Sequence, residues 1–227
     1  HPYILMNFTE RIRDVMTLAH ELGHGLHQFL SRQQGYLQCD TPLTTAEMAS
    51  VFGEMLTFRR LLELYPAPRL RLAMLCSKIE DAFATVFRQV VLTRFEQKLH
   101  DARQKQGELS ADTVNQLWLS TNQAMFGDSV QLTEGYAWWW LYIGHFIRAP
   151  FYCYAYAFGE LLVLALFQKY KQDGPAFVPK YLDLLSAGGS DAPHVLLAKL
   201  GVDVNDPAFW ELGLKLLGAM VAEAEEL

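Results

Sequence analysis

The sequence lacks a continuous apolar run of the length that a membrane span requires. The most apolar stretch, residues 151–167, is too short to cross a bilayer comfortably and contains Glu160. Clusters of lysine and arginine are also absent from the sequence, and the net charge is −6. A nucleic-acid-binding surface usually carries excess positive charge, so this composition argues against such a partner. We therefore expect neither a membrane nor a nucleic acid as a partner.

Cysteine is scarce, and the three residues present are Cys39, Cys76 and Cys153. Their odd number and the absence of a Cys-x-x-Cys spacing argue against a disulfide framework. Reduced thiols are typical of the cytoplasm, which is the location we expect. Charged residues make up 19% of the chain and hydrophobic residues 51%, which excludes a disordered protein and indicates a well-buried core.

Apolar residues recur at helical spacing along most of the chain, and glycine, proline and N-cap residues divide it into segments. The expected helices are residues 9–34, 44–65, 69–106, 110–127, 151–172, 175–186, 193–200 and 206–227. The aromatic segment 132–147 is expected to be partly helical and largely buried. Since no repeat or domain linker is visible, the predicted fold is one all-α domain over residues 1–227, with at most a short N-terminal strand at residues 3–6.

The most informative motif is His20-Glu21-Leu22-Gly23-His24. Side chains four residues apart lie on one face of a helix, so His20 and His24 can both bind one cation. Glu21 lies beside that cation, where it can take a proton from a metal-bound water. This arrangement is typical of zinc peptidases, and the alternative is two core histidines on a buried helix. Gly23 and Gly25 are poor helix formers that would permit another segment to approach closely.

A catalytic zinc needs a third protein ligand. The metzincin pattern would place glycine at position 27 and histidine at position 30, but the chain has His27 and Leu30. A glutamate on the following helix is the alternative, and Glu47 and Glu54 share one face because seven residues make nearly two turns. Three points stay open on these grounds. Glu47 is a ligand or closes a capping box with Thr44. Glu54 orients a ligand histidine or pairs with Arg59 or Arg60, and His27 is an outer-shell or a core histidine.

Three separated segments resemble the oligoendopeptidase F family, which is related to thimet oligopeptidase. Residues 17–27, TLAHELGHGLH, resemble its zinc helix, and residues 45–54, TAEMASVFGE, resemble the helix with its third zinc ligand. The resemblance implies a zincin-like helical catalytic domain with one zinc ion bound by His20, His24 and Glu47. Members of this family are longer, so it also implies that an N-terminal helical part is missing from this chain.

The third segment, residues 145–156 (HFIRAPFYCYAY), resembles the family's His-and-Tyr segment, which faces the zinc and contacts the peptide at the cleaved bond. The resemblance implies roles for His145, Tyr152 and Tyr154, while Tyr156 is assigned to packing. The spacing from His145 to the tyrosines differs from that in thimet oligopeptidase, which leaves the role of each tyrosine open.

We therefore expect a zinc metallo-endopeptidase that hydrolyses short peptides, with Glu21 as the general base. One alternative is a zinc carboxypeptidase that would hold the substrate's terminal carboxylate with Arg148. The other is a helical interaction module in which zinc is structural or absent. The aromatic surface also predicts that the chain associates with itself or with the missing N-terminal segment.

Overall fold

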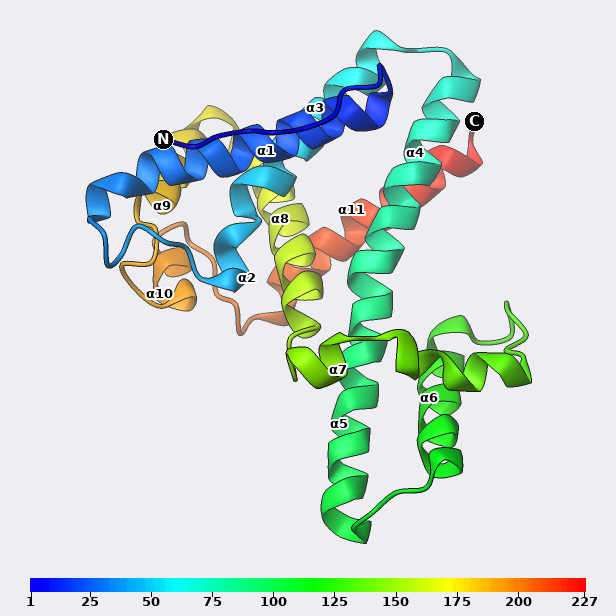
Figure 1. The fold of residues 1–227 in the computed structure, drawn as a ribbon. Helices are drawn as coiled ribbons and strands as arrows, with labels where there is room; N and C mark the ends of the chain where they lie inside the picture. The colour runs from blue at the N-terminus through cyan, green and yellow to red at the C-terminus, as the bar shows by residue number, and fades with distance from the viewer. The chain divides into compact units, whose positions relative to one another are not determined.

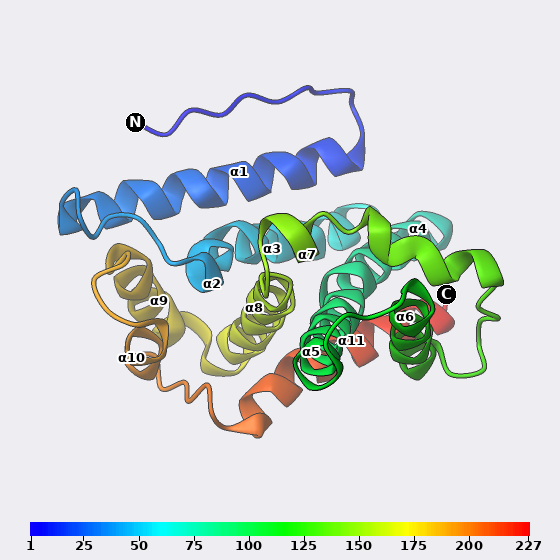
Figure 2. The same cartoon turned by 60° about the horizontal axis from the view of Figure 1, so that its bottom comes forward.

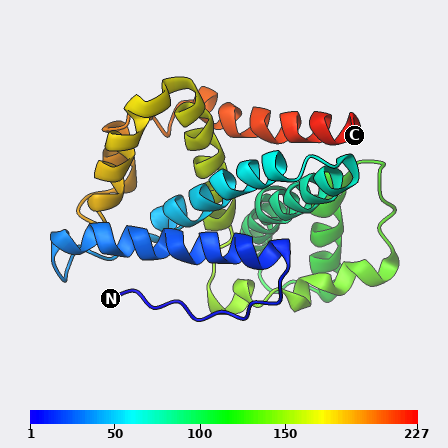
Figure 3. The same ribbon diagram turned by 90° about the horizontal axis from the view of Figure 1, so that it is seen from above.

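The structure, a computed structural model, describes the backbone of residues 1–227 and the side chains of all of them except Leu43. The described chain is helical and contains no strand, which confirms the all-α fold class (Figure 1). Residues 1–11 form an irregular arm that runs back alongside α1 (Figures 2 and 3). The α-helices are α1 (Ile12–Ser31), α2 (Leu43–Ala46), α3 (Met48–Leu64), α4 (Pro68–Ala82), α5 (Arg88–Gln106), α6 (Ala111–Phe126), α7 (His145–Arg148), α8 (Tyr154–Asp173), α9 (Phe177–Ser186), α10 (Pro193–Ala198) and α11 (Pro207–Glu225).

The chain divides into two compact units, which are described separately. The first unit comprises His1–Asp81 and Phe158–Leu227, and the second comprises Ala82–Ala157. Whether the whole of residues 1–227 acts as one catalytic domain stays a prediction.

In the first unit, α1 packs along α3, and glycines permit a very close crossing (Figure 3). A Cβ atom at Gly23 would lie 2.5 Å from Cα of Ser50, and one at Gly53 would lie 3.1 Å from the carbonyl oxygen of Ala19. The expectation that glycine permits a close approach is therefore confirmed for Gly23. At Gly25 a Cβ would meet the side chain of Pro2 at an ordinary contact distance of 3.6 Å.

The core of this unit is built around α3 and α8. The ring of Phe52 contacts the rings of Phe167, Phe177 and Tyr181, and the Tyr181 hydroxyl donates a hydrogen bond of 2.7 Å to the carbonyl oxygen of Met48. Residues 162–166 of α8 are fully buried, as expected for the most apolar run of the sequence. Among the described helices, none combines the length and the apolarity of a membrane span.

Most helix ends agree with the capping signals in the sequence. Ser110 and Asp206 cap α6 and α11 through their side chains, and Gly35 has a φ of 76° after a final 3₁₀ turn of the first helix. Two expected helices are interrupted. Residues 44–65 are broken at Glu47 into α2 and α3, and residues 69–106 contain a π-helical turn at Phe83–Phe87 between α4 and α5.

In the second unit, α6 packs against both α5 and the 3₁₀ helix Glu134–Tyr142. Its core includes Phe95 and Trp118, whose rings meet edge to face at 5.1 Å. The expectation that residues 132–147 are largely buried is wrong, because Trp138 and Trp139 are about half exposed and Tyr142 is 79% exposed. The 3₁₀ helix turns part of its aromatic surface outward, and helical periodicity alone did not reveal this.

Candidate active site

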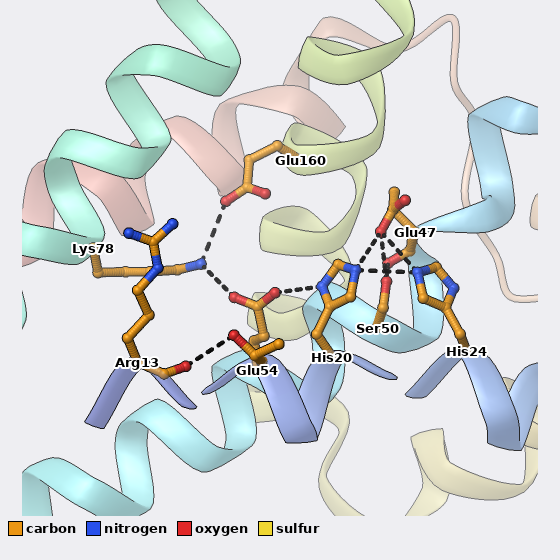
Figure 4. Close-up of polar contacts among 9 residues, drawn as sticks. Arg13, His20, His24, Glu47, Ser50, Glu54, Lys78 and Glu160 are labelled. Atoms are coloured by element: carbon orange, nitrogen blue, oxygen red, sulfur yellow. Dashed lines mark hydrogen bonds and ion pairs between the residues drawn. The ribbon is translucent and has the colours of Figure 1, made fainter. Parts of the chain in front are cut away.

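The two motif histidines lie one turn apart on α1 and face the same point (Figure 4). Their Nε2 atoms are 3.1 Å apart, and the rings meet edge to face with centroids 4.7 Å apart. Val15, Leu18 and Ala19, which precede the motif, line an open apolar groove between α1 and α3. The helix therefore presents both imidazoles in a fixed direction.

Glu47 lies at the break between α2 and α3, where its backbone leaves the regular helix with φ −83° and ψ 0°. Its Oε2 atom lies 3.4 Å from Nε2 of His20 and 3.5 Å from Nε2 of His24. The Ser50 hydroxyl donates a 2.6 Å hydrogen bond to the same oxygen. Because α2 begins at Leu43, one residue before Thr44, the local geometry does not follow the capping-box alternative.

The three ligand atoms form a group with the dimensions of a tetrahedral metal site. Zinc–ligand bonds of about 2.0–2.1 Å at tetrahedral angles place neighbouring ligand atoms about 3.3 Å apart. The three observed separations, 3.1, 3.4 and 3.5 Å, lie close to that value. Two nitrogens and one carboxylate oxygen are also a donor set that zinc prefers. The side chains of His20, His24 and Glu47 are 27%, 29% and 43% exposed, so water and a ligand can reach this point.

Glu54 contacts the other ring nitrogen of His20. Its Oε1 atom lies 2.5 Å from Nδ1 of His20, whereas Arg59 and Arg60 pair with other carboxylates. This hydrogen bond raises the pKa of the His20 imidazole against the opposing effect of burial, and nearby glutamate charges add to the rise. A carboxylate on the non-ligating nitrogen is the usual way in which a metal-binding histidine is oriented.

The contacts continue beyond Glu54 to two residues that the sequence did not connect with the metal site. Nζ of Lys78, on α4, lies 3.4 Å from Oε2 of Glu54 and 3.8 Å from Oε1 of Glu160, on α8. Burial raises the pKa of the Glu54 carboxyl, but the hydrogen bond with His20 and the charge of Lys78 together bring it below its ordinary value. Burial is also the main cause of the raised pKa of Glu160. Glu160 stands out in the sequence because it interrupts the most apolar run, but no local signal links it to the metal site, and Lys78 looks like an ordinary charged helix residue.

The remaining acidic and histidine residues of α1 differ in their surroundings. Glu21 is half-buried and close enough to His20 for its charge to raise the pKa of that imidazole. His27 is only 3% exposed, and its Nδ1 atom is buried without a hydrogen-bond partner among the described residues. Burial, aided by the charge of His24, lowers the pKa of His27 to about 4. These surroundings are those of a core histidine.

In the second unit, His145 belongs to a small aromatic cluster with two tyrosines. Its ring stacks on Tyr152 with centroids 5.7 Å apart, and its Nε2 atom lies 3.2 Å from the hydroxyl of Tyr156. Tyr156 was assigned to packing from the sequence, and the hydrogen bond adds a polar contact that periodicity could not indicate. Tyr154 lies in the first turn of α8 and is 51% exposed.

Comparison with known proteins gives a consistent result. Residues 1–216 match the model of peptidase family M3. The chain is 32% identical over 228 residues to the oligopeptidase PepF of Bacillus subtilis, covering 100% of this chain and 34% of that protein. It is 30% identical over 226 residues to an oligoendopeptidase F homolog of Lactococcus lactis, covering 99% of this chain and 37% of that protein.

Solved structures agree with these relatives. A putative peptidase from Chlamydophila abortus superposes with a TM-score of 0.92 at 28% identity, over 100% of this chain and 38% of the other. Oligoendopeptidase-F from Enterococcus faecium superposes with a TM-score of 0.83 at 28% identity, over 95% and 39%. The chain thus spans little more than a third of the length of the proteins it matches.

Proposed function

The chain belongs to peptidase family M3, and from this premise we propose that it is a zinc-dependent endopeptidase that hydrolyses short oligopeptides. The observation that carries the proposal is the convergence of His20, His24 and Glu47 at tetrahedral ligand separations. These three residues would bind one zinc ion. Their partial exposure favours a catalytic site over the closed four-ligand site of a structural zinc. The unpaired cysteines accord with the cytoplasmic location that we propose.

When bound, zinc supplies a Lewis acid that polarises the substrate carbonyl and makes water a stronger nucleophile. The protein would supply the proton transfers. Glu21 follows the first histidine on α1 and is half-buried, so its carboxylate can accept the proton that the attacking water loses. The same group can then deliver the proton to the nitrogen of the departing amine. Glu54 would hold the His20 ring in the orientation that points Nε2 toward the metal.

Three residues of the second unit would stabilise the developing negative charge. His145, Tyr152 and Tyr154 offer an imidazole and two phenols as hydrogen-bond donors to a carbonyl oxygen that becomes an oxyanion. One such donor commonly contributes about 3 kcal/mol of transition-state stabilisation. The exposed Tyr154 is the tyrosine that we propose for this role, and the hydrogen bond between Tyr156 and His145 would orient the imidazole.

Metal content of the full-length protein tests the ligand set. We expect about one zinc per chain in the wild type, and a sharp loss in His20→Ala and Glu47→Ala. His194→Ala is the matched control, because His194 is an exposed histidine on α10 and should leave zinc content unchanged. Stoichiometric zinc in both ligand variants would refute the assignment.

Peptide hydrolysis tests the mechanism and the reaction class. Glu21→Gln should keep its zinc and lose at least about a hundredfold in activity, because the amide cannot accept a proton. Glu226→Gln, at an exposed position after α11, is the control. A peptide with an amidated C-terminus separates the two peptidase classes, since an endopeptidase cleaves it and a carboxypeptidase does not. Tyr154→Phe should lower kcat more than it raises KM.

A further inference from the structure

A buried ionic cluster lies behind His20, on the side away from His24 (Figure 4). It consists of Lys78 on α4, Glu160 on α8 and Glu54 on α3. The side chains of Lys78 and Glu160 are each 8% exposed and that of Glu54 is 20% exposed. The lysine ammonium lies between the two carboxylates, 3.4 Å from that of Glu54 and 3.8 Å from that of Glu160. The cluster therefore links three helices through charges that are largely withdrawn from water.

Stability alone is a weak explanation for such a cluster. Removing charged groups from water costs several kcal/mol per ion, and apolar residues of similar size often serve a core equally well or better. Most of the rest of this core consists of apolar and aromatic residues, among them the fully buried run of residues 162–166 on α8. A buried lysine with two glutamates in this setting suggests a positional role.

The two oxygens of Glu54 point to that role. Oε1 accepts a hydrogen bond from Nδ1 of His20 at 2.5 Å, and Oε2 faces Nζ of Lys78 at 3.4 Å. A carboxylate held at both oxygens cannot rotate away from either partner. The opposite nitrogen of the same imidazole, Nε2, lies 3.4 Å from Glu47. Glu54 and Glu47 thus contact the ring of His20 from its two nitrogens.

We propose that Lys78, anchored by Glu160, is a positioning residue that holds the Glu54 carboxylate against Nδ1 of His20 and so fixes the direction of Nε2 at the metal site. The proposal rests on the zinc site proposed above. Lys78 acts through Glu54, and its described ion pairs are with Glu54 and Glu160 rather than with a proposed metal ligand. Because Lys78 and Glu160 come from α4 and α8, packing of these helices is coupled to the orientation of a ligand on α1.

The test compares zinc binding by the full-length wild type and Lys78→Met, which removes the charge and keeps most of the side chain. We expect the zinc Kd of Lys78→Met at fixed pH to rise about tenfold, the lower end of outer-shell effects on metal affinity. We also expect the visible absorption spectrum of the cobalt-substituted protein to change, because this spectrum depends on how the ligands are arranged around the metal. Lys78→Arg should restore part of the affinity.

The matched control is Arg71→Met, on the same helix. Arg71 pairs with Glu223 of α11 at 2.6 Å and has no contact with Glu54 among those described. Its loss should lower thermal stability without changing the zinc Kd or the cobalt spectrum. A change of the zinc Kd in Arg71→Met equal to that in Lys78→Met would show that general loosening of α4 is responsible and would overturn the proposal.

A double-mutant cycle tests the route of the effect. If Lys78 acts through Glu54, adding Lys78→Met to Glu54→Gln should weaken zinc binding no further. Additive losses would overturn the proposal. Should Lys78→Met fail to fold, Glu160→Gln provides the test, since it keeps the lysine but weakens its anchor. Glu160→Gln should shift the zinc Kd and the cobalt spectrum in the same direction but less, and wild-type values for both would overturn the proposal.

Failure of this inference can be separated from failure of the proposed function. A wild type that binds no stoichiometric zinc would refute the metal site itself, and the inference with it. A wild type that binds zinc and cleaves peptides, next to a Lys78→Met variant with the same Kd and spectrum, would refute the positioning role alone.

Discussion

Acid should destabilise the folded chain through His27, a residue that the proposed chemistry does not use. This histidine is 3% exposed, and burial lowers its pKa to about 4. In the unfolded chain the same imidazole has an ordinary pKa of about 6.5. Between these two values the unfolded state binds a proton that the folded state does not. The contribution of His27 to the free energy of unfolding is therefore fully present above pH 6.5 and is lost as the pH falls toward 4.

The size of the effect follows from the two pKa values. Proton linkage between pH 7 and pH 5 gives a loss of about 2 kcal/mol from this one group, rising to about 3 kcal/mol at pH 4. For a chain of this length each kcal/mol corresponds to roughly 2–4 °C in Tm. The predicted shift is thus well within the range that thermal or urea unfolding resolves.

The assay is urea unfolding, followed by circular dichroism at pH 7 and pH 5, of the wild type and His27→Phe. Phenylalanine keeps a flat ring and cannot titrate, and it removes the unpartnered Nδ1 atom from the core. A chelator in both samples prevents metal release from adding its own pH dependence. The difference between the two proteins isolates His27, because all other titrating groups are shared. An equal loss of stability in both proteins on acidification would refute the reasoning.

Two further predictions concern the packing of the first unit. Gly23→Ala should destabilise the fold and weaken zinc binding, since forcing a Cβ against the backbone of Ser50 costs roughly 1–3 kcal/mol and exceeds the helix gain of about 1 kcal/mol. Gly218→Ala, in α11 with open space around it, should instead stabilise by about 0.5–1 kcal/mol, and urea unfolding of both variants distinguishes close approach from helix propensity. Glu223→Gln should lower the free energy of unfolding by about 1–3 kcal/mol, because the carboxylate accepts hydrogen bonds from Arg59 and Arg71. This loss should shrink in high salt, and a salt-independent loss would show that the charge is not involved.

Local patterns predicted the helices well because each one carries its own stop signals. Gly35, Ser110 and Asp206 end or begin helices where the sequence placed them. The break at Glu47 has no such signal, since the residues around it favour a continuous helix. The break at Glu47 could therefore not be predicted from the local sequence.

The aromatic segment shows a second limit. Trp138 and Trp139 are apolar enough to predict burial, yet both are about half exposed. The hydrophobicity of a residue indicates that it prefers an apolar environment, but it does not indicate whether another segment of the chain covers that residue. The prediction that this surface serves an association is untested by the fold.

Some residues of the candidate site could be predicted from sequence spacing, and others could not. His20 and His24 are recognisable because a helix converts a spacing of four residues into proximity, and Glu47 and Glu54 share a face for a similar reason. Lys78 and Glu160 reach the site only because α4 and α8 pack beside α3, so their role depends on tertiary contacts between residues far apart in the sequence.

The crossing of α1 and α3 depends both on local sequence spacing and on tertiary contacts. Gly23 brings the two backbones so close that a Cβ atom there would clash with Ser50. Gly53 of α3 lies similarly close to the backbone of Ala19 on α1. At that separation, Glu47 at the break before α3 can contact Nε2 of His20, and Glu54, seven residues later on α3, can contact Nδ1. A wider crossing would carry both carboxylates out of hydrogen-bonding distance together. The geometry of the proposed metal site is therefore set by a rigid helix–helix contact, and Gly23 is as necessary to it as the two histidines between which it lies.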